Sequence, residues 1–394
     1  MPPEVTLARA MPHMAALGIT RIANVTGLDT IGIPVVMVTR PNAKSLSVAQ
    51  GKGPTLACAK ASGLMEAIES HHAENITRPL KLANFTQLQR DHRMIDLPSL
   101  PGYAGATFHS EQRTLWIEGQ DLADGGPRWL PFALAHTDFT LPLPPGSGAF
   151  FMGSSGLASG NHPLEAIVHG LCELIERDAA TMFRLAGDEA RRAARIDLDT
   201  IDDPGCRALL GQYGRAGVSV AVSDITGDAG VAAFHAVVID REPNLARALG
   251  PMGGMGCHPA REIALSRALT EAAQSRLTLI AGARDDMVSQ RLAPDAYLRA
   301  HADFHAARLA PGPLRRYSDI PTHAHARLED DLGFILGRLR AIGCGQVVAI
   351  NLTRPEVGIP VVRMVVPGLE ILNDLPGYSP GRRARPLCQR RAAR

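Results

Sequence analysis

The stretch GNHPLEAIVHGLCELIER, residues 160–177, joins a glycine turn to a helical run that ends with two glutamates three positions apart. Pro163 suits the first position of a helix, where the missing N–H needs no partner. At helical spacing, Glu173 and Glu176 fall on one side of the run and its aliphatic residues fall on the other. The stretch therefore predicts a helix over residues 163–184 with an apolar face and an acidic face.

Two further segments repeat this order of glycine turn, helical run and paired polar side chains. They run from Gly51 to the pair Glu66 and Glu69, and from Gly256 to the pair Glu271 and Gln274. Residues three apart lie on the same helix face, so each copy presents a small group of oxygen ligands. Clustered carboxylates repel one another unless a cation neutralises them, and Mg²⁺ prefers oxygen ligands. The repeat therefore predicts a site for magnesium and a nucleotide.

Each copy taken alone has a simpler interpretation, which is an ordinary helix with one solvated face. The recurrence of the pattern favours the magnesium site. Exposed helix faces normally mix lysine with glutamate, whereas the paired acids in these copies have no lysine partner on the same face. The glycine turns are a second ingredient, since N–H groups at a helix N-terminus can hold phosphate. Residues 250–256, GPMGGMG, are the richest of these turns. Glycines also serve tight turns, and the P-loop pattern does not occur in the sequence.

The composition is that of an ordinary soluble globular protein, with 394 residues, 45% of them hydrophobic and 20% charged. A net charge of +2 and an aromatic content of 4% favour neither nucleic acid nor another polyanion as a partner. The cysteines form no C-x-x-C pair, which argues against structural zinc and against a redox dithiol. The N-terminal residues lack the basic segment and continuous apolar stretch that a signal peptide is expected to have, and no apolar run is long enough to span a membrane. We therefore expect a cytoplasmic protein.

Strand and helix signals alternate irregularly along the chain. Apolar runs predict strands over residues 31–38, 218–222, 232–239, 346–350 and 359–366. Helical periodicity predicts helices over residues 55–75, 163–184, 259–281 and 329–342. This mixture predicts a mixed α/β fold with mixed sheets, in one composite domain over residues 1–377. The arginine-rich segment 378–394 is expected to be a disordered basic tail or, alternatively, a contact for an anionic partner.

The combination of these motifs resembles the YcaO-domain family. The supporting stretches are Gly51-Lys52-Gly53 followed by Ser62, Glu66 and Glu69, residues 173–178 (ELIERD), residues 268–274 (ALTEAAQ) and residues 352–370. The matching stretches extend over about residues 20–372. The resemblance therefore covers nearly the whole chain.

The resemblance implies a YcaO-type composite fold in which acidic helices bind ATP and Mg²⁺ and a peptide-backbone amide is activated by O-phosphorylation. Carried over by motif, the metal ligands are Glu66, Glu69, Glu173 and Glu176. The ATP-binding residues are Lys52, Ser62, Glu66, Glu165, Glu173, Glu176 and Arg177. The catalytic residues are Arg177, Glu271 and Gln274. The chain departs from the family at Ser70, where arginine usually follows the second glutamate.

The N-terminal stretch RIANVTGLDTIGIP, residues 21–34, resembles the subgroup found with TfuA partner proteins, which implies thioamide formation. The chain also lacks the P-x-P-x-P ending of azoline-forming members. The expected product is a thioamide in a ribosomal peptide or protein. The alternatives are an azoline-forming cyclodehydratase and a non-catalytic nucleotide-binding accessory protein. The expected partners are a TfuA-like protein, a peptide or protein substrate and a sulfur donor, without membrane or nucleic acid, and the chain is expected to form a homodimer.

Overall fold

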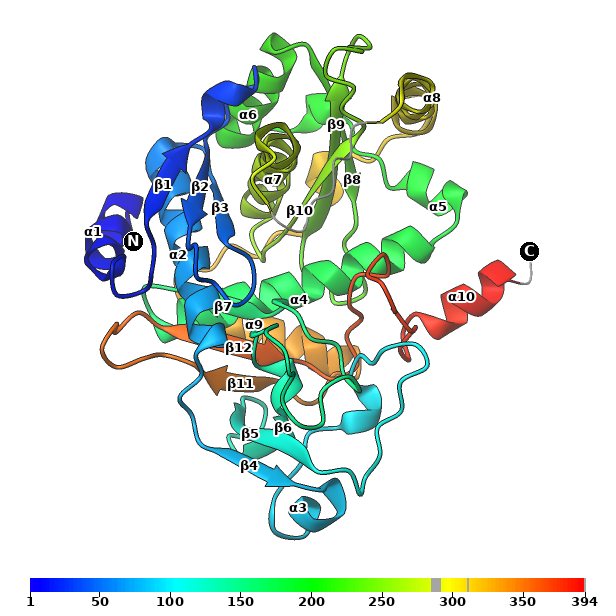
Figure 1. Ribbon diagram of the computed structural model, residues 1–394. Helices are drawn as coiled ribbons and strands as arrows, with labels where there is room; N and C mark the ends of the chain where they lie inside the picture. Colours follow the sequence, from blue (N-terminus) through cyan, green and yellow to red (C-terminus); the bar gives the residue numbers. More distant parts are fainter. Residues whose placement is uncertain (285–291, 310–311, 393–394) are drawn as a thin grey trace. The chain divides into compact units, whose positions relative to one another are not determined.

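The structure of the protein, a computed structural model, describes residues 1–284, 292–309 and 312–392 (Figure 1). The chain divides into two compact units. Unit 1 consists of Met1–Asn42, Leu46–Ala67 and Ala186–Ala324, and unit 2 of Ala43–Ser45, Ile68–Leu185 and His325–Arg394. Helix α2 (Leu56–Glu74) has residues in both units. The single domain expected over residues 1–377 stays a prediction.

Unit 1 contains the antiparallel sheet β1–β2–β3 and the antiparallel sheet β10–β9–β8. The strands are β1 (Arg21–Asn24), β2 (Val35–Thr39), β3 (Val48–Lys52), β8 (Val218–Asp224), β9 (Ala233–Asp240) and β10 (Met252–Cys257). Besides the start of α2, the helices are α1 (Pro3–Ala10), α5 (Asp188–Ala193), α6 (Pro204–Arg215), α7 (Arg261–Ala281) and α8 (Pro294–Phe304). Helix α7 contacts strands of both sheets, as Figure 1 shows.

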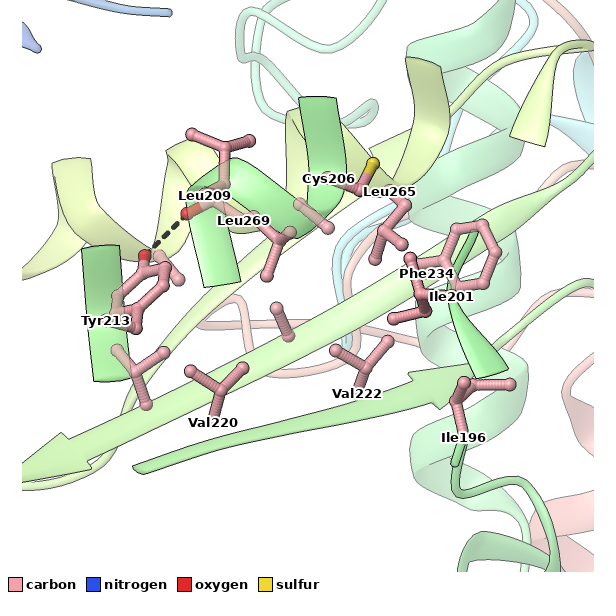
Figure 2. Packing of buried hydrophobic residues seen from close by; sticks show 14 of the residues in the cluster. Ile196, Ile201, Cys206, Leu209, Tyr213, Val220, Val222, Phe234, Leu265 and Leu269 are labelled. Atoms are coloured by element: carbon pink, nitrogen blue, oxygen red, sulfur yellow. Dashed lines mark hydrogen bonds between the residues drawn. The ribbon is translucent and has the colours of Figure 1, made fainter. Parts of the chain in front are cut away.

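The core of unit 1 lies where α6 and α7 cover one face of the sheet β10–β9–β8. Strand residues alternate between the two faces of a sheet. Val220 belongs to the core beneath the helices, whereas Ala221 packs with Phe304 of α8. Figure 2 shows Tyr213 of α6 in this core, where its hydroxyl donates to the carbonyl oxygen of Leu269 at 2.6 Å. Because both faces are buried and differ in their partners, a one-residue slip in register would disrupt both.

The glycine stretch at residues 250–256 is largely strand β10, so the expectation of a glycine turn there was wrong, whereas phosphate binding by these residues stays a prediction. Gly256 lies in β10 directly against α7, where a Cβ atom would lie 2.1 Å from the carbonyl oxygen of Ala264. Gly51 in β3 is similar, because a Cβ atom there would lie 2.0 Å from the carbonyl oxygen of Ala59 in α2. The glycines of these two copies therefore let a strand pack closely on the helix that follows it.

Gly256→Ala is expected to lower the free energy of unfolding by about 1–3 kcal/mol, because the added methyl group would overlap the backbone of α7. Urea-induced unfolding measures this change. Gly214→Ala in α6 is the matched control, since nothing lies within 4 Å of a Cβ atom at that position. Alanine is also the better helix former of the two residues. Equal losses of stability in the two variants would contradict the packing role of Gly256.

Unit 2 is built on a sheet with the strand order β4–β5–β11–β12–β7, with β6 paired to β5. The strands are β4 (Leu80–Ala83), β5 (Thr114–Asp121), β6 (Pro127–Pro131), β7 (Leu157–Ser159), β11 (Val348–Asn351) and β12 (Val361–Val365). Besides the end of α2, the helices are α3 (Phe85–Asp91), α4 (Pro163–Leu185), α9 (Leu328–Ala341) and α10 (Arg385–Ala392). Helix α4 packs on β7 and β12 and against α9 (Figure 1).

The basic C-terminal segment, for which composition suggested a disordered tail, is attached to unit 2 through two carboxylates. Glu370 accepts hydrogen bonds from the backbone nitrogens of Gly381, Arg383 and Ala384 at 3.0, 3.2 and 2.9 Å. The guanidinium of Arg383 donates to both oxygens of Asp178, at 2.9 and 3.0 Å. Burial raises the pKa of Asp178, and Arg383 opposes that shift. Asp178 lies 205 residues away from Arg383 in the sequence, so composition does not reveal this attachment.

The predicted mixed α/β fold is confirmed. The helices α2, α4, α7 and α9 begin and end within two residues of their expected bounds, as do the strands β8, β9, β11 and β12. Strand β2 begins later than expected, because Gly32 adopts a φ of +79° and Pro34 follows it. None of the helices in the described residues combines the length and apolar composition that a membrane crossing requires.

Candidate active site

Lys52, at the end of β3, binds two of the predicted catalytic side chains of α7. Its ammonium group forms a salt bridge with Glu271 and donates to Oε1 of Gln274 at 3.2 Å. The other oxygen of Glu271 accepts from the backbone nitrogen of Met255 at 3.1 Å. The side chains of Lys52 and Glu271 are only 19% and 20% exposed. The fold of unit 1 thus joins a cation, a carboxylate and an amide from segments far apart in the sequence.

A pocket of about 410 Å³ opens beside Lys52 in unit 1. Its walls include Lys52, Pro54, Ser62, Asp203, Ile263 and Arg267. Two predicted ATP-binding residues, Lys52 and Ser62, therefore line one pocket. Arg267, which was absent from the predicted site, adds a second cationic side chain. A pocket of this size with apolar walls and a few polar groups is large enough for a small molecule.

Glu165 lies in the first turn of α4 and closes the N-terminus of that helix. Its carboxylate accepts from the backbone nitrogen of Asn161 at 2.8 Å and from the side-chain amide of the same residue at 3.4 Å. A negative charge at this end also interacts favourably with the helix dipole. The structure therefore gives Glu165 a capping role, whereas its contact with ATP stays a prediction.

Arg177 joins the two glutamates of the predicted metal site on α4. Its Nη2 lies 3.2 Å from Oε1 of Glu173, and its Nη1 lies 3.4 Å from Oε1 of Glu176. Glu173 also accepts from the backbone nitrogen of Gly156, before β7, at 3.1 Å. The side chain of Glu176 is only 2% exposed. This acidic face is therefore not the solvated surface that the simpler interpretation of the helix required.

Glu66 and Glu69 lie one turn apart on α2, and the division between the units falls between them. Oε1 of Glu69 accepts from the backbone nitrogen and from the hydroxyl of Ser159 in β7, at 2.8 and 2.7 Å. Glu66 is exposed. The structure thus groups Lys52, Ser62, Glu271 and Gln274 in unit 1, and Glu173, Glu176 and Arg177 in unit 2. Convergence of all these side chains on one nucleotide stays a prediction.

The side chains on α4 suit a magnesium ion that arrives with phosphate. Within the described part of the chain, no group of three or more His, Cys, Asp or Glu side chains is placed to hold a metal ion. Mg²⁺ commonly uses one or two carboxylates together with substrate phosphates and water. Glu173 and Glu176 can supply the carboxylates, and Arg177 beside them can face phosphate charge. The donor set therefore fits Mg²⁺ bound to a nucleotide.

Arg363 in β12 is a buried cation that the predicted site did not include. Its side chain is 4% exposed. Burial lowers the pKa of its guanidinium to about 10, and the charge of Glu173 opposes this shift. One signal in the sequence could have identified it, because a single arginine interrupts the apolar run IPVVRMVV at residues 359–366. A charge in the middle of a buried strand is costly and calls for an explanation.

Comparison with known proteins identifies the class. The family model described as "YcaO cyclodehydratase, ATP- and Mg²⁺-binding" matches residues 50–370. The chain therefore belongs to the YcaO family of ATP- and Mg²⁺-binding enzymes, and its general chemistry is the ATP-dependent activation of peptide amides. The resemblance drawn from the sequence motifs is confirmed, together with its ATP and Mg²⁺ cofactors.

Two relatives are similar to this chain over most of its length. An uncharacterized protein in the tfuA 3′ region of Rhizobium leguminosarum bv. trifolii is 38% identical over 379 residues, 94% of this chain and 88% of the relative. An uncharacterized protein of Methanothermobacter thermautotrophicus is 36% identical over 383 residues, 94% of each chain. The first relative supports the TfuA-associated subgroup.

Two solved structures show the same fold. YcaO from Methanopyrus kandleri, bound with AMPPCP and Mg²⁺, superposes with a TM-score of 0.74 at 22% identity, covering 97% of this chain and 95% of that one. A heterocyclase in complex with substrate and cofactor superposes with a TM-score of 0.77 at 24% identity, covering 94% of this chain. The present chain spans about half of that heterocyclase, 52% of its length.

Proposed function

We propose that the protein replaces the oxygen of a peptide-backbone amide by sulfur, giving a thioamide in a ribosomal peptide or protein. Sulfide forms the new bond to the carbonyl carbon, and the amide oxygen accepts the terminal phosphoryl group of ATP. The carbon–oxygen bond then breaks, and phosphate leaves with that oxygen and with the sulfide proton. The observation that carries the ATP-dependent part is the buried acidic face of α4, where Glu173 and Glu176 hold Arg177.

The side chains of the chain would position the reactants and neutralise charge, which is the main requirement of phosphoryl transfer. ATP with its Mg²⁺ supplies the phosphoryl group. Glu173 and Glu176, with Glu66 and Glu69, would hold the metal, and Arg177 would neutralise phosphate charge. In unit 1, the pocket beside Lys52 and Ser62 would bind ATP, with Lys52 oriented by its contacts with Glu271 and Gln274.

Two observations favour the thioamide product. A relative that is 38% identical is described by its place in the tfuA 3′ region, and residues 21–34 of this chain resemble the TfuA-associated subgroup. We therefore propose a TfuA-like partner that recruits the substrate or delivers sulfur, and a homodimeric state for this chain. An azoline-forming reaction is the second candidate, because the matching family model is described as a cyclodehydratase.

Mass spectrometry distinguishes these products. The protein is incubated with a TfuA-like partner, ATP, Mg²⁺, sulfide and a candidate peptide. The proposal requires one oxygen-to-sulfur exchange in the peptide for each phosphate released, and no exchange without sulfide. Loss of water from a peptide containing Cys, Ser or Thr would instead identify an azoline. Nucleotide binding without phosphate release under every condition would identify a non-catalytic accessory protein.

A further inference from the structure

A short segment after β12 runs along the C-terminal half of α4. The backbone N–H of Glu370 donates to Oδ1 of Asp178 at 2.9 Å. The hydroxyl of Thr181 donates to the carbonyl oxygen of Ile371 at 2.6 Å and accepts the backbone N–H of Asn373 at 3.1 Å. Asp178 and Thr181 are three residues apart, so they share one face of the helix. This face of α4 is therefore joined to the segment by specific hydrogen bonds.

Arg383 fastens this segment, residues 370–374, which is named the strap. The carboxylate of Glu370, the first residue of the strap, accepts the backbone N–H of Arg383 at 3.2 Å. The guanidinium of Arg383 donates to both oxygens of Asp178, at 2.9 and 3.0 Å. The two side chains are only 9% and 3% exposed. A paired contact between arginine and carboxylate fixes geometry as well as charge, so Asp178 is held both by the strap and by Arg383.

The face of α4 that contacts the strap lies on the other side of the helix from the predicted Mg²⁺ ligands. At 3.6 residues per turn, Asp178 lies about 140° around the helix from Glu173. A helix moves as a rigid element, so holding one face sets the rotation of the other. Glu176 is 2% exposed and lies 3.4 Å from Arg177. In such close surroundings, a glutamate has little freedom to correct a rotation of the helix by changing its rotamer.

We propose that Arg383 is a positioning residue for the Mg²⁺ site of α4. Through Asp178 it fixes the rotation of the helix, and this rotation aims Glu173 and Glu176 at the metal. Arg383 acts only through Asp178 and is no ligand itself. The inference rests on the proposed function, because it takes the two glutamates as Mg²⁺ ligands. Loss of a residue that orients metal ligands from outside typically weakens metal affinity by roughly 10- to 100-fold.

The Mg²⁺ concentration that gives half-maximal AMPPCP binding to the intact chain tests this role without peptide, sulfide or turnover. Arg383→Met removes both hydrogen bonds to Asp178 and keeps an unbranched stem, and it is expected to raise that concentration about 10-fold or more. Arg383→Lys keeps the positive charge and should recover part of the loss. Urea-induced unfolding measures stability separately, because a merely structural residue would lower stability without changing the Mg²⁺ requirement of the folded protein.

Thr181→Val is a second variant that tests the strap without changing any charge. It removes the hydroxyl that joins α4 to Ile371 and Asn373 and keeps the shape of the side chain. It should raise the same Mg²⁺ concentration. Arg385→Met is the matched control, since Arg385 is exposed and its Nε donates to the carbonyl oxygen of the nearby Pro380 at 3.1 Å. This variant should keep the wild-type Mg²⁺ requirement.

A wild-type Mg²⁺ requirement in Arg383→Met overturns the proposal, whatever its stability. The same result in Thr181→Val also overturns it, because the rotation of α4 would then not depend on the strap. Should Arg383→Met fail to fold, Arg383→Lys takes its place, since lysine cannot donate to both carboxylate oxygens in the fixed geometry of a guanidinium. A raised Mg²⁺ requirement in that variant supports the proposal, and a wild-type requirement overturns it.

Glu176→Gln separates failure of this proposal from failure of the proposed site. If Glu176→Gln raises the Mg²⁺ requirement and Arg383→Met does not, α4 carries the metal ligands but Arg383 does not position them. If both variants keep the wild-type requirement, the assignment of the ligands to α4 is wrong as well. Thioamide formation enters neither measurement, so its failure would leave these results unchanged.

Discussion

Glu176→Gln is expected to reduce ATP-dependent phosphate release to a small residual rate while the protein stays folded. Glutamine keeps the shape of the side chain, which is 2% exposed and lies 3.4 Å from Nη1 of Arg177, but removes its negative charge. Loss of one preorganised charge at a phosphoryl-transfer site lowers the rate by roughly 10²- to 10³-fold. Phosphate release at saturating ATP measures the loss, and circular dichroism with AMPPCP binding reports on the fold and the site.

The magnesium dependence separates a metal ligand from a merely structural residue. If Glu176 holds Mg²⁺, the concentration of Mg²⁺ needed for half-maximal residual activity should rise in Glu176→Gln. Glu329→Gln makes the same change on an exposed glutamate in the first turn of α9, and it should keep both wild-type values. A wild-type rate in Glu176→Gln, or a loss of activity that accompanies unfolding, would show that the assignment of Glu176 is wrong.

Arg276→Met is expected to cost unit 1 about 3–5 kcal/mol of unfolding free energy, because it leaves two buried carboxylates without their main partner. The fully buried guanidinium of Arg276 lies 2.8 Å from Asp29 and 2.9 Å from Asp240. Through it, the segment after β1 is connected to the end of β9 and to α7. Urea-induced unfolding at neutral pH measures the loss.

The pH dependence of that loss tests its cause. Burial is the largest single effect and raises the pKa of Asp29, but the hydrogen bond and charge of Arg276, together with the backbone N–H of Thr30 and the charge of Arg247, outweigh it. The pKa therefore lies below the ordinary value of 3.8. Asp29 therefore stabilises the wild type above that pH, and this contribution disappears as the pH falls through the lowered pKa. In Arg276→Met the buried carboxyl can protonate, so the difference between the two proteins should shrink towards acidic pH. A double variant that adds Asp29→Asn should recover part of the stability, and a difference independent of pH would contradict an electrostatic origin.

The elements with long apolar periodicity could be predicted from the sequence, but the glycine-rich strand could not. Helices such as α4 repeat their apolar positions over several turns, so their bounds follow from the residues alone. Strand β10 has poor intrinsic strand propensity, since glycine has no side chain to pack on a sheet. Tertiary packing accounts for this strand, because glycine lets α7 lie directly on it. A Cβ atom at Gly256 would collide with Ala264 of α7. The division into units falls within α2, where the sequence shows no change of composition.

The motifs identified the chemical groups of the candidate site but not how those groups pair. Helical spacing placed Glu173 and Glu176 on one face, and the structure adds that Arg177 joins them. The contact of Lys52 with Glu271 joins positions more than two hundred residues apart, so no local pattern could reveal it. Arg363 was overlooked because a strand among apolar residues was treated as core.

The attachment of the chain end through Arg383 matters for anyone who shortens the gene or adds a fusion partner. Asp178, which Arg383 neutralises, directly follows Arg177 on α4. Deleting the last dozen codons would remove Arg383, and with it the countercharge of a buried acid on α4. Loss of activity in such a truncated enzyme would reflect damage to α4, and affinity tags are better placed at the other terminus.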